Sequence, residues 1–380
     1  MNDTVVTPGE VARRTIRRTD WVPCKAAFID CRTPGSDRKD NYSFIGAGVS
    51  QNADQHVNLQ EPHGFNLGAA GMPNGTINSL HLHFTAEVFI NFDGDYQLRW
   101  GADGRQGEFR SVDGDVVSVP SWIFRGFTNV GADEGVLLTV LGRDDNGGII
   151  WGPDVLRDAA GHGLYLTADN QLIDTVQGQQ VPPGTALIEP MPQEEIDRLD
   201  VFTEAQFRGR VTTAADREWV AEPFLCSRLA GGGAQLSLVI GYGMSEDRRA
   251  VPRLHEPHGF SLAWLRAGAG EGVLTHRHAA TQVVTARTGR WAVRLNTGSD
   301  EQVVELGRLD TLSVPPGAWR GFTQLDEGEG ELLVVTGGDG RTELDWLPEV
   351  VEAARRNGRM RDANGYVSPA AVLTGATEDD

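Results

Sequence analysis

Short apolar runs separated by turn residues make up most of the chain. Four of them in the first half are rich in β-branched and aromatic residues: Leu80–Phe92, Tyr96–Trp100, Val116–Val119 and Gly135–Leu141. Runs of this length and composition predict β-strands. Helices are expected only at about 153–160 and 348–357 and from Gln193 to Phe202, where a proline stands at or just before the start. The pattern therefore predicts an all-β fold with short peripheral helices.

The whole pattern occurs twice, at an offset of 195 residues. Four motifs return at this spacing: Glu61-Pro62-His63-Gly64-Phe65 as Glu256-Pro257-His258-Gly259-Phe260, His81 and His83 as His276 and His278, Arg125-Gly126-Phe127-Thr128 as Arg320-Gly321-Phe322-Thr323, and Trp151 as Trp346. The copies cover about 24–172 and 219–367 without a net insertion. Such self-similarity predicts two domains of one fold. We expect an N-terminal domain at 1–190 and a C-terminal domain at 200–380, with the boundary near 185–205.

Composition narrows the class of partner. A chain of 380 residues suits two domains, and 47 Gly and 18 Pro favour turns over long helices. The net charge of −19 would repel phosphate backbones and anionic membranes, so neither nucleic acid nor membrane is an expected partner. No apolar run has the form of a signal peptide or a membrane span, and the three cysteines lack C-x-x-C spacing. We therefore expect a soluble, cytoplasmic protein.

Two histidines and a glutamate in the first copy form a candidate metal site. His81, His83 and Glu87 stand at i, i+2 and i+6, which would place them on one face of a continuous strand. Two imidazoles and a carboxylate leave coordination positions open on iron(II) for substrate and dioxygen. The spacing therefore predicts one divalent ion in the first copy. Manganese, nickel and zinc also accept these donors.

The site and its surroundings resemble two motifs of the cupin superfamily. The first motif, G-x5-H-x-H-x3-E-x6-G, is matched by Gly75, His81, His83, Glu87 and Gly94. The second, G-x5-P-x-G-x2-H-x3-N, is similar to Gly114, Pro120, Trp122, Arg125 and Asn129. Here Trp122 replaces a glycine, and Arg125 stands where the family has its last metal-binding histidine. The resemblance implies a bicupin, with two tandem jelly-roll barrels and a homo-oligomeric assembly. Residues 120–125 are also similar to the gentisate-type ring-cleaving dioxygenases.

Arg125 and His63 are the candidate catalytic residues beside the metal. A guanidinium has no lone pair, so Arg125 cannot be a ligand. Either it clamps a substrate carboxylate or enolate, or it forms an ion pair with Glu87 that fills an empty site. If Phe65–Gly71 and Ile77–His83 form a hairpin, His63 falls near the metal as an extra ligand or a substrate contact. The alternative is that His63 belongs to a turn and caps backbone groups.

The second copy carries a weaker version of the same face. It consists of His276, His278 and Gln282, with Arg320 again in place of a histidine. A neutral amide is a poorer ligand than a carboxylate for a hard divalent cation. We therefore expect this site to bind metal weakly or not at all.

Three functions are compatible with these residues. The leading one is an iron(II) dioxygenase that oxidises a small aromatic or enolic acid with O2, as the resemblance implies. Four aromatic residues are candidates for its substrate pocket, although they also suit a core: Phe89, Trp122, Phe124 and Phe127. A second possibility is an isomerase, lyase or decarboxylase that uses the metal as a Lewis acid without oxygen. A third is a non-catalytic bicupin that binds a small ligand or only assembles.

Overall fold

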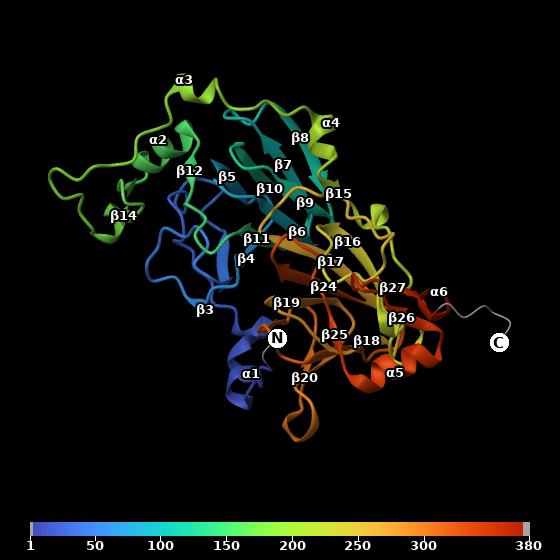
Figure 1. The fold of residues 1–380 in the computed structure, drawn as a ribbon. Coiled ribbons are helices and arrows are strands. Elements are labelled where there is room, and N and C mark those ends of the chain that lie inside the picture. Colours follow the sequence, from blue (N-terminus) through green and yellow to red (C-terminus); the bar gives the residue numbers. More distant parts are fainter. Residues whose placement is uncertain (1–2, 375–380) are drawn as a thin grey trace. The chain divides into compact units, whose positions relative to one another are not determined.

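The computed structural model describes residues 3–374 and shows β-sheets in two sets, one for each copy of the repeat (Figure 1). The chain divides into two compact units. One unit is Val22–Asp216. The other unit consists of two parts of the chain: the N-terminal segment that ends at Trp21, and the residues from Arg217 onward.

The Val22–Asp216 unit contains most of its strands in two sheets. The strands are β2 (Asp40–Ile45), β3 (Val57–Leu59), β4 (Phe65–Met72), β5 (Ile77–Leu82), β6 (Glu87–Asp93), β7 (Tyr96–Trp100), β8 (Gly107–Ser111), β9 (Val116–Val119), β10 (Arg125–Asn129), β11 (Gly135–Gly142), β12 (Ile150–Trp151), β13 (Leu164–Leu166), β14 (Leu172–Asp174) and β15 (Val211–Thr212). The helices are α2 (Pro153–Gly161), α3 (Gln193–Ile196), α4 (Glu204–Arg208) and the 3-10 turns η2 (Thr175–Gln177) and η3 (Ala214–Asp216). One sheet has the order β15-β9-β6-β11-β4-β2-β3, the other β12-β5-β10-β7-β8, and β13 pairs with β14. Two sheets of this kind are the jelly-roll arrangement that the sequence predicts.

Strands β7, β9 and β11 confirm three of the predicted runs, but two local predictions are wrong. The run Leu80–Phe92 is not one strand, because β5 ends at Leu82, β6 begins at Glu87, and the two lie in different sheets. Strands β4 and β5 form no hairpin, since β4 pairs with β2 and β11 whereas β5 pairs with β10 and β12. In both places the chain crosses from one sheet to the other. Alternation of apolar residues predicts which face is buried but not which sheet a strand joins.

The other unit repeats this architecture. Its strands are β1 (Thr15–Ile16), β16 (Gln235–Ile240), β17 (Phe260–Ala267), β18 (Gly272–Arg277), β19 (Gln282–Thr288), β20 (Trp291–Leu295), β21 (Gln302–Leu306), β22 (Thr311–Val314), β23 (Arg320–Gln324), β24 (Gly330–Gly337), β25 (Asp345–Trp346), β26 (Arg359–Arg361) and β27 (Val367–Pro369). Its helices are α1 (Pro8–Arg14), α5 (Pro348–Arg356), α6 (Ala370–Thr374) and the 3-10 turns η1 (Arg18–Asp20), η4 (Leu225–Arg228) and η5 (Gly298–Asp300). The sheets run β1-β22-β19-β24-β17-β16 and β21-β20-β23-β18-β25, and β26 pairs with β27.

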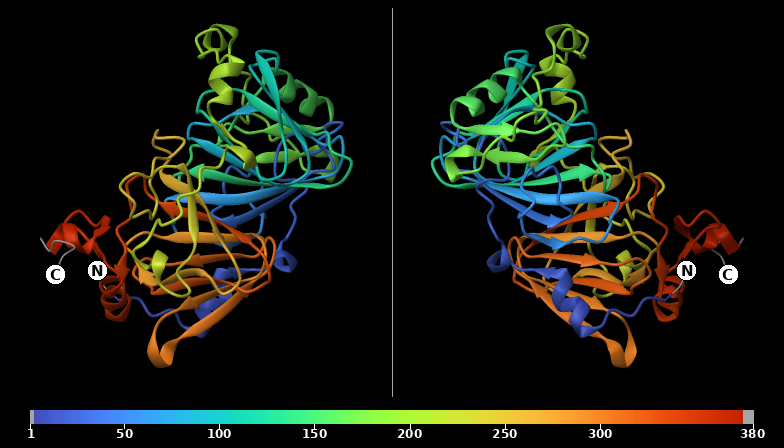
Figure 2. Two further views of the ribbon diagram at one scale, coloured as in Figure 1. Left: turned by 90° about the vertical axis from the view of Figure 1, so that its right-hand side faces the viewer. Right: turned by 90° about the vertical axis from the view of Figure 1, so that its left-hand side faces the viewer.

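The N-terminal segment packs on the second copy, which differs from the expected domain at 1–190. Strand β1 pairs with β22, and Figure 2 shows helix α1 in blue against the orange strands of this copy. The backbone of Val6 exchanges hydrogen bonds of 2.8 and 2.9 Å with the side chain of Asn296. Arg17 forms a 2.9 Å ion pair with Asp310. Because these contacts join residues almost 300 positions apart, no local pattern in the sequence indicates them.

The boundary between the first and the second copy also lies later in the chain than the expected 185–205. Residues 200–216 belong with the first copy, because β15 pairs with β9 and Phe207 of α4 stacks on Trp100 with ring centroids 4.3 Å apart. The predicted helix from Gln193 to Phe202 is shorter and ends at Ile196.

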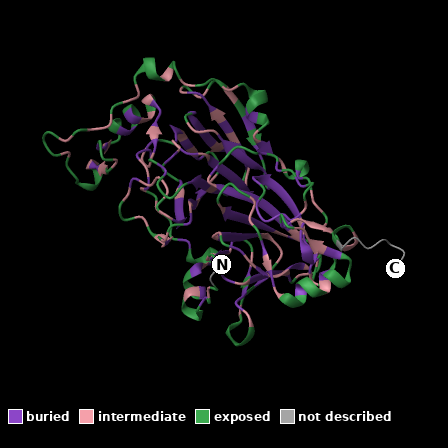
Figure 3. Ribbon diagram, viewed as in Figure 1, coloured by how far each residue is buried: buried purple, intermediate pink, exposed green. Residues whose placement is uncertain are grey.

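Burial follows the sheets in both units. Figure 3 shows buried residues concentrated in the strands and exposed residues in the helices and loops. Among residues 3–374 there is no helix with the length and apolar character needed to cross a bilayer. The three cysteines, Cys24, Cys31 and Cys226, are free thiols.

Candidate metal centre

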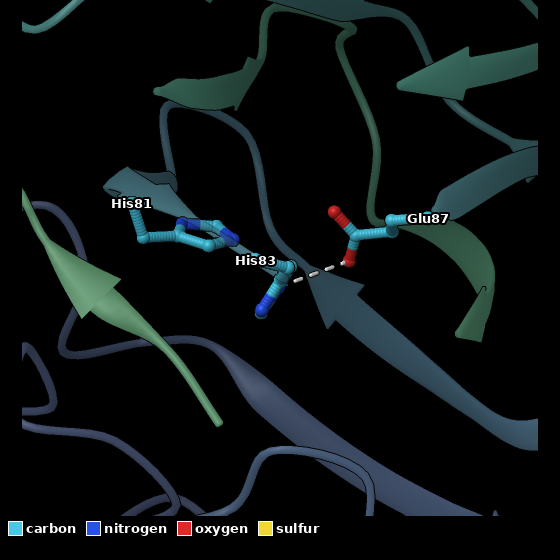
Figure 4. A group of neighbouring side chains, drawn as sticks. All are labelled: His81, His83 and Glu87. Carbon is cyan, nitrogen blue, oxygen red and sulfur yellow. Dashed lines mark ion pairs between the residues drawn. The ribbon is translucent and has the colours of Figure 1, made fainter. Parts of the chain in front are cut away.

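The predicted ligands meet at the link between β5 and β6. His81 is on β5, His83 follows the end of that strand, and Glu87 opens β6 in the other sheet. All three side chains are buried, and one ligand atom of each lies within 4.8 Å of the others. Figure 4 shows the ring of His81 directed toward the other two side chains, with the contact between His83 and Glu87 dashed. The structure thus brings these residues together from two facing strands rather than along one.

Backbone carbonyls set the orientation of both imidazoles. Nδ1 of His81 donates to the carbonyl of Ser79 at 2.7 Å, and Nδ1 of His83 donates to the carbonyl of Gly148 at 3.0 Å. Each Nε2 is then left with its lone pair toward the site, as metal-binding histidines require. Burial, and next the charge of Arg125, lowers the pKa of His81 well below its ordinary value, and the pKa of His83 is lowered for the same reasons. Both rings are therefore neutral at neutral pH, which is the form that binds a metal.

Arg125 lies against Glu87. Its Nε and Nη2 donate to Oε2 of Glu87 at 2.9 and 2.6 Å, and its Nη1 donates to the carbonyls of His81 and Ile123 at 3.3 Å. Burial alone would raise the pKa of Glu87, but the attraction of Arg125 holds that pKa below its ordinary value. The ion pair named above as the alternative to a substrate clamp is thus present. The ion pair uses only Oε2 of Glu87. The other carboxylate oxygen, Oε1, lies 3.6 Å from Nε2 of His83.

A cavity of about 90 Å³ opens beside these three ligands. Phe89, Phe127 and Trp151 form part of its apolar wall. Seven Ser, Thr, Asn and Gln side chains line it as well, and the sequence-based prediction missed all of them: Asn41, Ser43, Ser50, Gln55, Asn66, Asn78 and Thr139. A signal for them was available, because five of the seven matching positions of the second copy are apolar: Leu236, Leu238, Ala250, Val273 and Val334.

The remaining predicted site residues do not line this cavity. The ring of Trp122 is exposed, and Phe124 is buried elsewhere. His63 is buried in a turn, where Oδ1 of Asp144 accepts from the backbone N–H groups of His63 and Gly64 at 2.8 and 2.9 Å. Asp339 makes the same pair of bonds in the second copy. Nδ1 of His63 lies 2.6 Å from the carbonyl oxygen of Glu61, and Nδ1 of His258 lies 2.6 Å from that of Glu256, which matches the alternative that this histidine caps backbone groups.

Trp122 departs from the cupin motif at a position with positive φ. Its φ is 61°, whereas the second copy has Gly317 there with φ of 78°. A side chain in this region costs roughly 1–2 kcal/mol. The Trp122 N–H donates to the carbonyl of His83 at 3.0 Å, and the ring packs edge-on against Phe84. The strained residue therefore helps to hold the loop that carries a ligand.

The matching site in the second copy is arranged differently. Nε2 of His278 accepts from Nη1 of Arg320 at 3.1 Å, so that nitrogen is not free for a metal. Nε2 of Gln282 donates to Oγ1 of Thr336 and contacts the sulfur of Met244. The two histidine rings are 6.2 Å apart here, against 4.9 Å in the first copy.

Arg320 also lacks the counter-charge that Arg125 has. No carboxylate among residues 3–374 lies within ion-pair distance of it, and its donors go to His278 and to the carbonyls of Pro315 and Ala318. Burial lowers the pKa of Arg320 to about 9. This geometry supports the expectation of weak or absent metal binding in the second copy.

Comparison with solved structures identifies the fold. The 7S globulin of Momordica charantia matches with a TM-score of 0.53 at 11% identity, over 95% of both chains. Vicilin from Capsicum annuum matches with 0.53 at 12% identity over 88% of both chains. An oxalate decarboxylase matches with 0.51 at 11% identity, over 94% of this chain and 85% of the other. No protein-family model and no curated protein matches the sequence.

The two pairs of sheets give a fold of the cupin type, in agreement with these structures. In fold, the chain has two tandem jelly-roll domains, as these structures do. The resemblance of residues 120–125 to gentisate-type dioxygenases finds no support in these comparisons.

Proposed function

We propose that the Val22–Asp216 unit is a metal-dependent enzyme that acts on a small organic acid. The observation that carries the proposal is the convergence of three buried donors on the wall of a cavity. Nε2 of His81, Nε2 of His83 and Oε1 of Glu87 would hold the ion. When bound, a divalent ion with three protein ligands supplies a Lewis-acid centre with open positions for substrate.

The charges around the site favour an anionic substrate. Glu87 and Arg125 neutralise each other, so their pair does not offset the charge of a divalent ion. Burial makes that excess positive charge costly unless an anion accompanies it. A carboxylate or enolate in the cavity would supply the missing negative charge.

The size of the cavity favours a small enolic or aliphatic acid over an aromatic one. Its volume is about 90 Å³, whereas a protein cavity that binds benzene measures about 150 Å³. The seven Ser, Thr, Asn and Gln side chains on its wall also suit a compact, highly polar ligand better than a ring.

Within this class we favour an iron(II) dioxygenase, because two histidines and one carboxylate leave positions for both an acid and O2. Chemistry without oxygen, such as decarboxylation, is the second candidate. One structure of similar fold is an oxalate decarboxylase, named for a small dicarboxylate. The ion pair of Arg125 with Glu87 favours the third candidate, a non-catalytic ligand-binding bicupin like the 7S globulin in fold. A homo-oligomeric assembly stays a prediction.

Two assays on one preparation separate these candidates. Protein purified without added metal is analysed for its metals and then mixed with oxalate, malonate or small enolic acids in an oxygen electrode. Oxygen uptake that is lost in Glu87→Ala and kept in Gln282→Ala supports the dioxygenase. Release of CO2 without oxygen uptake supports the decarboxylase. Metal binding without any turnover would refute an enzymatic role with these acids.

A further inference from the structure

A buried charge pair lies directly behind the cavity of the first copy. Lys39 and Asp30 are 2% and 0% exposed, and Nζ of Lys39 lies 3.0 Å from Oδ2 of Asp30. Nζ also donates to Oδ1 of Asn78 at 2.6 Å. Burying two charges costs several kcal/mol per ion before their attraction is counted, and apolar residues often replace such pairs without loss of stability. The pair therefore calls for a reason other than stability.

The second copy shows that the fold does not need this pair. The positions of Asp30, Lys39 and Asn78 correspond to Leu225, Ala234 and Val273, which belong to the hydrophobic core of the other unit. Asn78 and Val273 lie in the matching strands β5 and β18, and Lys39 and Ala234 directly precede the matching strands β2 and β16. The charged set is thus present only in the copy that has the His-His-Glu site.

A β-bulge brings Asn78 to the same face as His81. In the pairing of β5 with β10, His81 is opposite Arg125 and Asn78 is opposite Phe127, so three steps on β5 match two on β10. An extra residue of this kind changes which side chains share a face. Asn78 consequently lines the cavity beside His81, His83 and Glu87.

Lys39 determines which end of the Asn78 amide faces the cavity. An ammonium only donates hydrogen bonds, so the atom next to Nζ must be the amide oxygen. Nδ2 is then turned away from Lys39, and within residues 3–374 no hydrogen-bond partner of Nδ2 is found. The amide therefore presents two N–H donors to the cavity.

The same pair also supports a metal ligand. Oδ2 of Asp30 accepts from the backbone N–H of Ser79 at 3.3 Å, and the carbonyl of Ser79 accepts from Nδ1 of His81 at 2.7 Å. One buried carboxylate thus holds both Lys39 and the residue that orients His81.

We propose that Lys39 and Asp30 are positioning residues for the metal and substrate site. They hold the Asn78 amide with its nitrogen toward the cavity, where it donates to a carboxylate oxygen of the bound acid. This inference rests on the proposed function, because it assumes that the cavity takes a small acid next to a metal.

A double-mutant cycle tests it with Mn²⁺-loaded protein and oxalate, and with malonate as a second ligand, by titration calorimetry. Asn78→Val introduces the residue found at the matching position of the second copy. The double change Asp30→Leu with Lys39→Met replaces the buried charge pair by apolar side chains. Each should weaken oxalate binding about ten- to a hundredfold, the effect of losing a hydrogen bond to a charged group. In protein saturated with Mn²⁺, combining them should add little to the loss of oxalate binding, because both act on the same donor. Arg32→Met is the control, since it breaks the Arg32–Asp174 ion pair of the same unit away from the cavity and should leave oxalate affinity unchanged.

Asn78→Asp keeps the size of the side chain and its contact with Lys39 but turns the donor into an anion, so it should abolish oxalate binding even if the paired variant does not fold. Full oxalate affinity in Asn78→Val or Asn78→Asp, or additive effects in the cycle, would overturn the inference. So would wild-type protein that binds Mn²⁺ but neither dicarboxylate. Wild-type protein that fails to bind Mn²⁺, or Glu87→Ala that still binds it, would instead refute the proposed function.

Discussion

Replacing Arg125 by methionine separates its two possible roles. In the structure, the guanidinium donates twice to Oε2 of Glu87, and both side chains are almost fully buried. Arg125→Met keeps most of the apolar volume but leaves Glu87 as a buried carboxylate without its partner. The structure therefore predicts a less stable metal-free protein with a higher affinity for metal.

The size of both effects can be estimated from the loss of this pair. Breaking a buried ion pair from one side typically costs about 3–5 kcal/mol. In a domain of this size, that corresponds to a fall of roughly 6–20 °C in the melting temperature of the first unit. A divalent ion would restore a positive charge beside Glu87, so metal should recover most of the loss.

Calorimetric melting with and without Mn²⁺ measures the stability, and titration of Mn²⁺ measures the affinity. Arg320→Met is the matched control, because Arg320 occupies the same position in the second copy without a carboxylate partner. It should produce no metal-dependent change in melting. Arg125→Lys should restore the charge but not the two-point contact, and should give an intermediate result.

The substrate-clamp alternative predicts the reverse pattern. If Arg125→Met bound Mn²⁺ with unchanged affinity and lost only oxalate binding, the ion pair would not be the main role of Arg125. Equal metal rescue in Arg320→Met would also contradict the reasoning, since no carboxylate depends on that residue.

Three further predictions concern residues outside the first site. His63→Asn should leave metal content unchanged in elemental analysis, because the ring lies in a turn and not on the cavity. Gln282→Glu should raise the melting temperature of the second unit by giving Arg320 a counter-charge, and a lower melting temperature would contradict this. Burial raises the pKa of Glu246 from its ordinary 4.5 to about 7, so the folded unit holds a proton between these pH values that the unfolded chain releases. Stability should therefore fall by roughly 3 kcal/mol as pH rises through this window. Melting of Glu246→Gln at pH 5 and pH 8 should show that the slope is lost.

The repeat and the metal ligands could be predicted from the sequence because both are recognised from short sequence motifs. The 195-residue offset aligned the two copies, and the spacing of His81, His83 and Glu87 identified the one cluster of this kind found in residues 3–374. The reason given for that spacing was wrong, however. The three residues converge because the chain crosses between two sheets, not because they share a strand.

Features that depend on distant contacts could not be predicted in the same way. The pairing of Arg125 with Glu87 was one of two readings, and only the distance between them shows that the ion pair is formed. The packing of β1 on β22 joins residues almost 300 positions apart without any local signal. The polar lining of the cavity was detectable, since Asn41 and Asn78 align with Leu236 and Val273 of the second copy. The alignment shows only that these residues differ, however, and not where they point.

The metal content of three proteins tests the central claim most directly. Wild-type protein, Glu87→Ala and His276→Ala are expressed in parallel, purified without chelator and analysed by inductively coupled plasma mass spectrometry. The structure predicts one divalent ion per chain in the wild type and in His276→Ala, and almost none in Glu87→Ala. Metal retained in Glu87→Ala and lost in His276→Ala would place the functional site in the other copy and contradict the account.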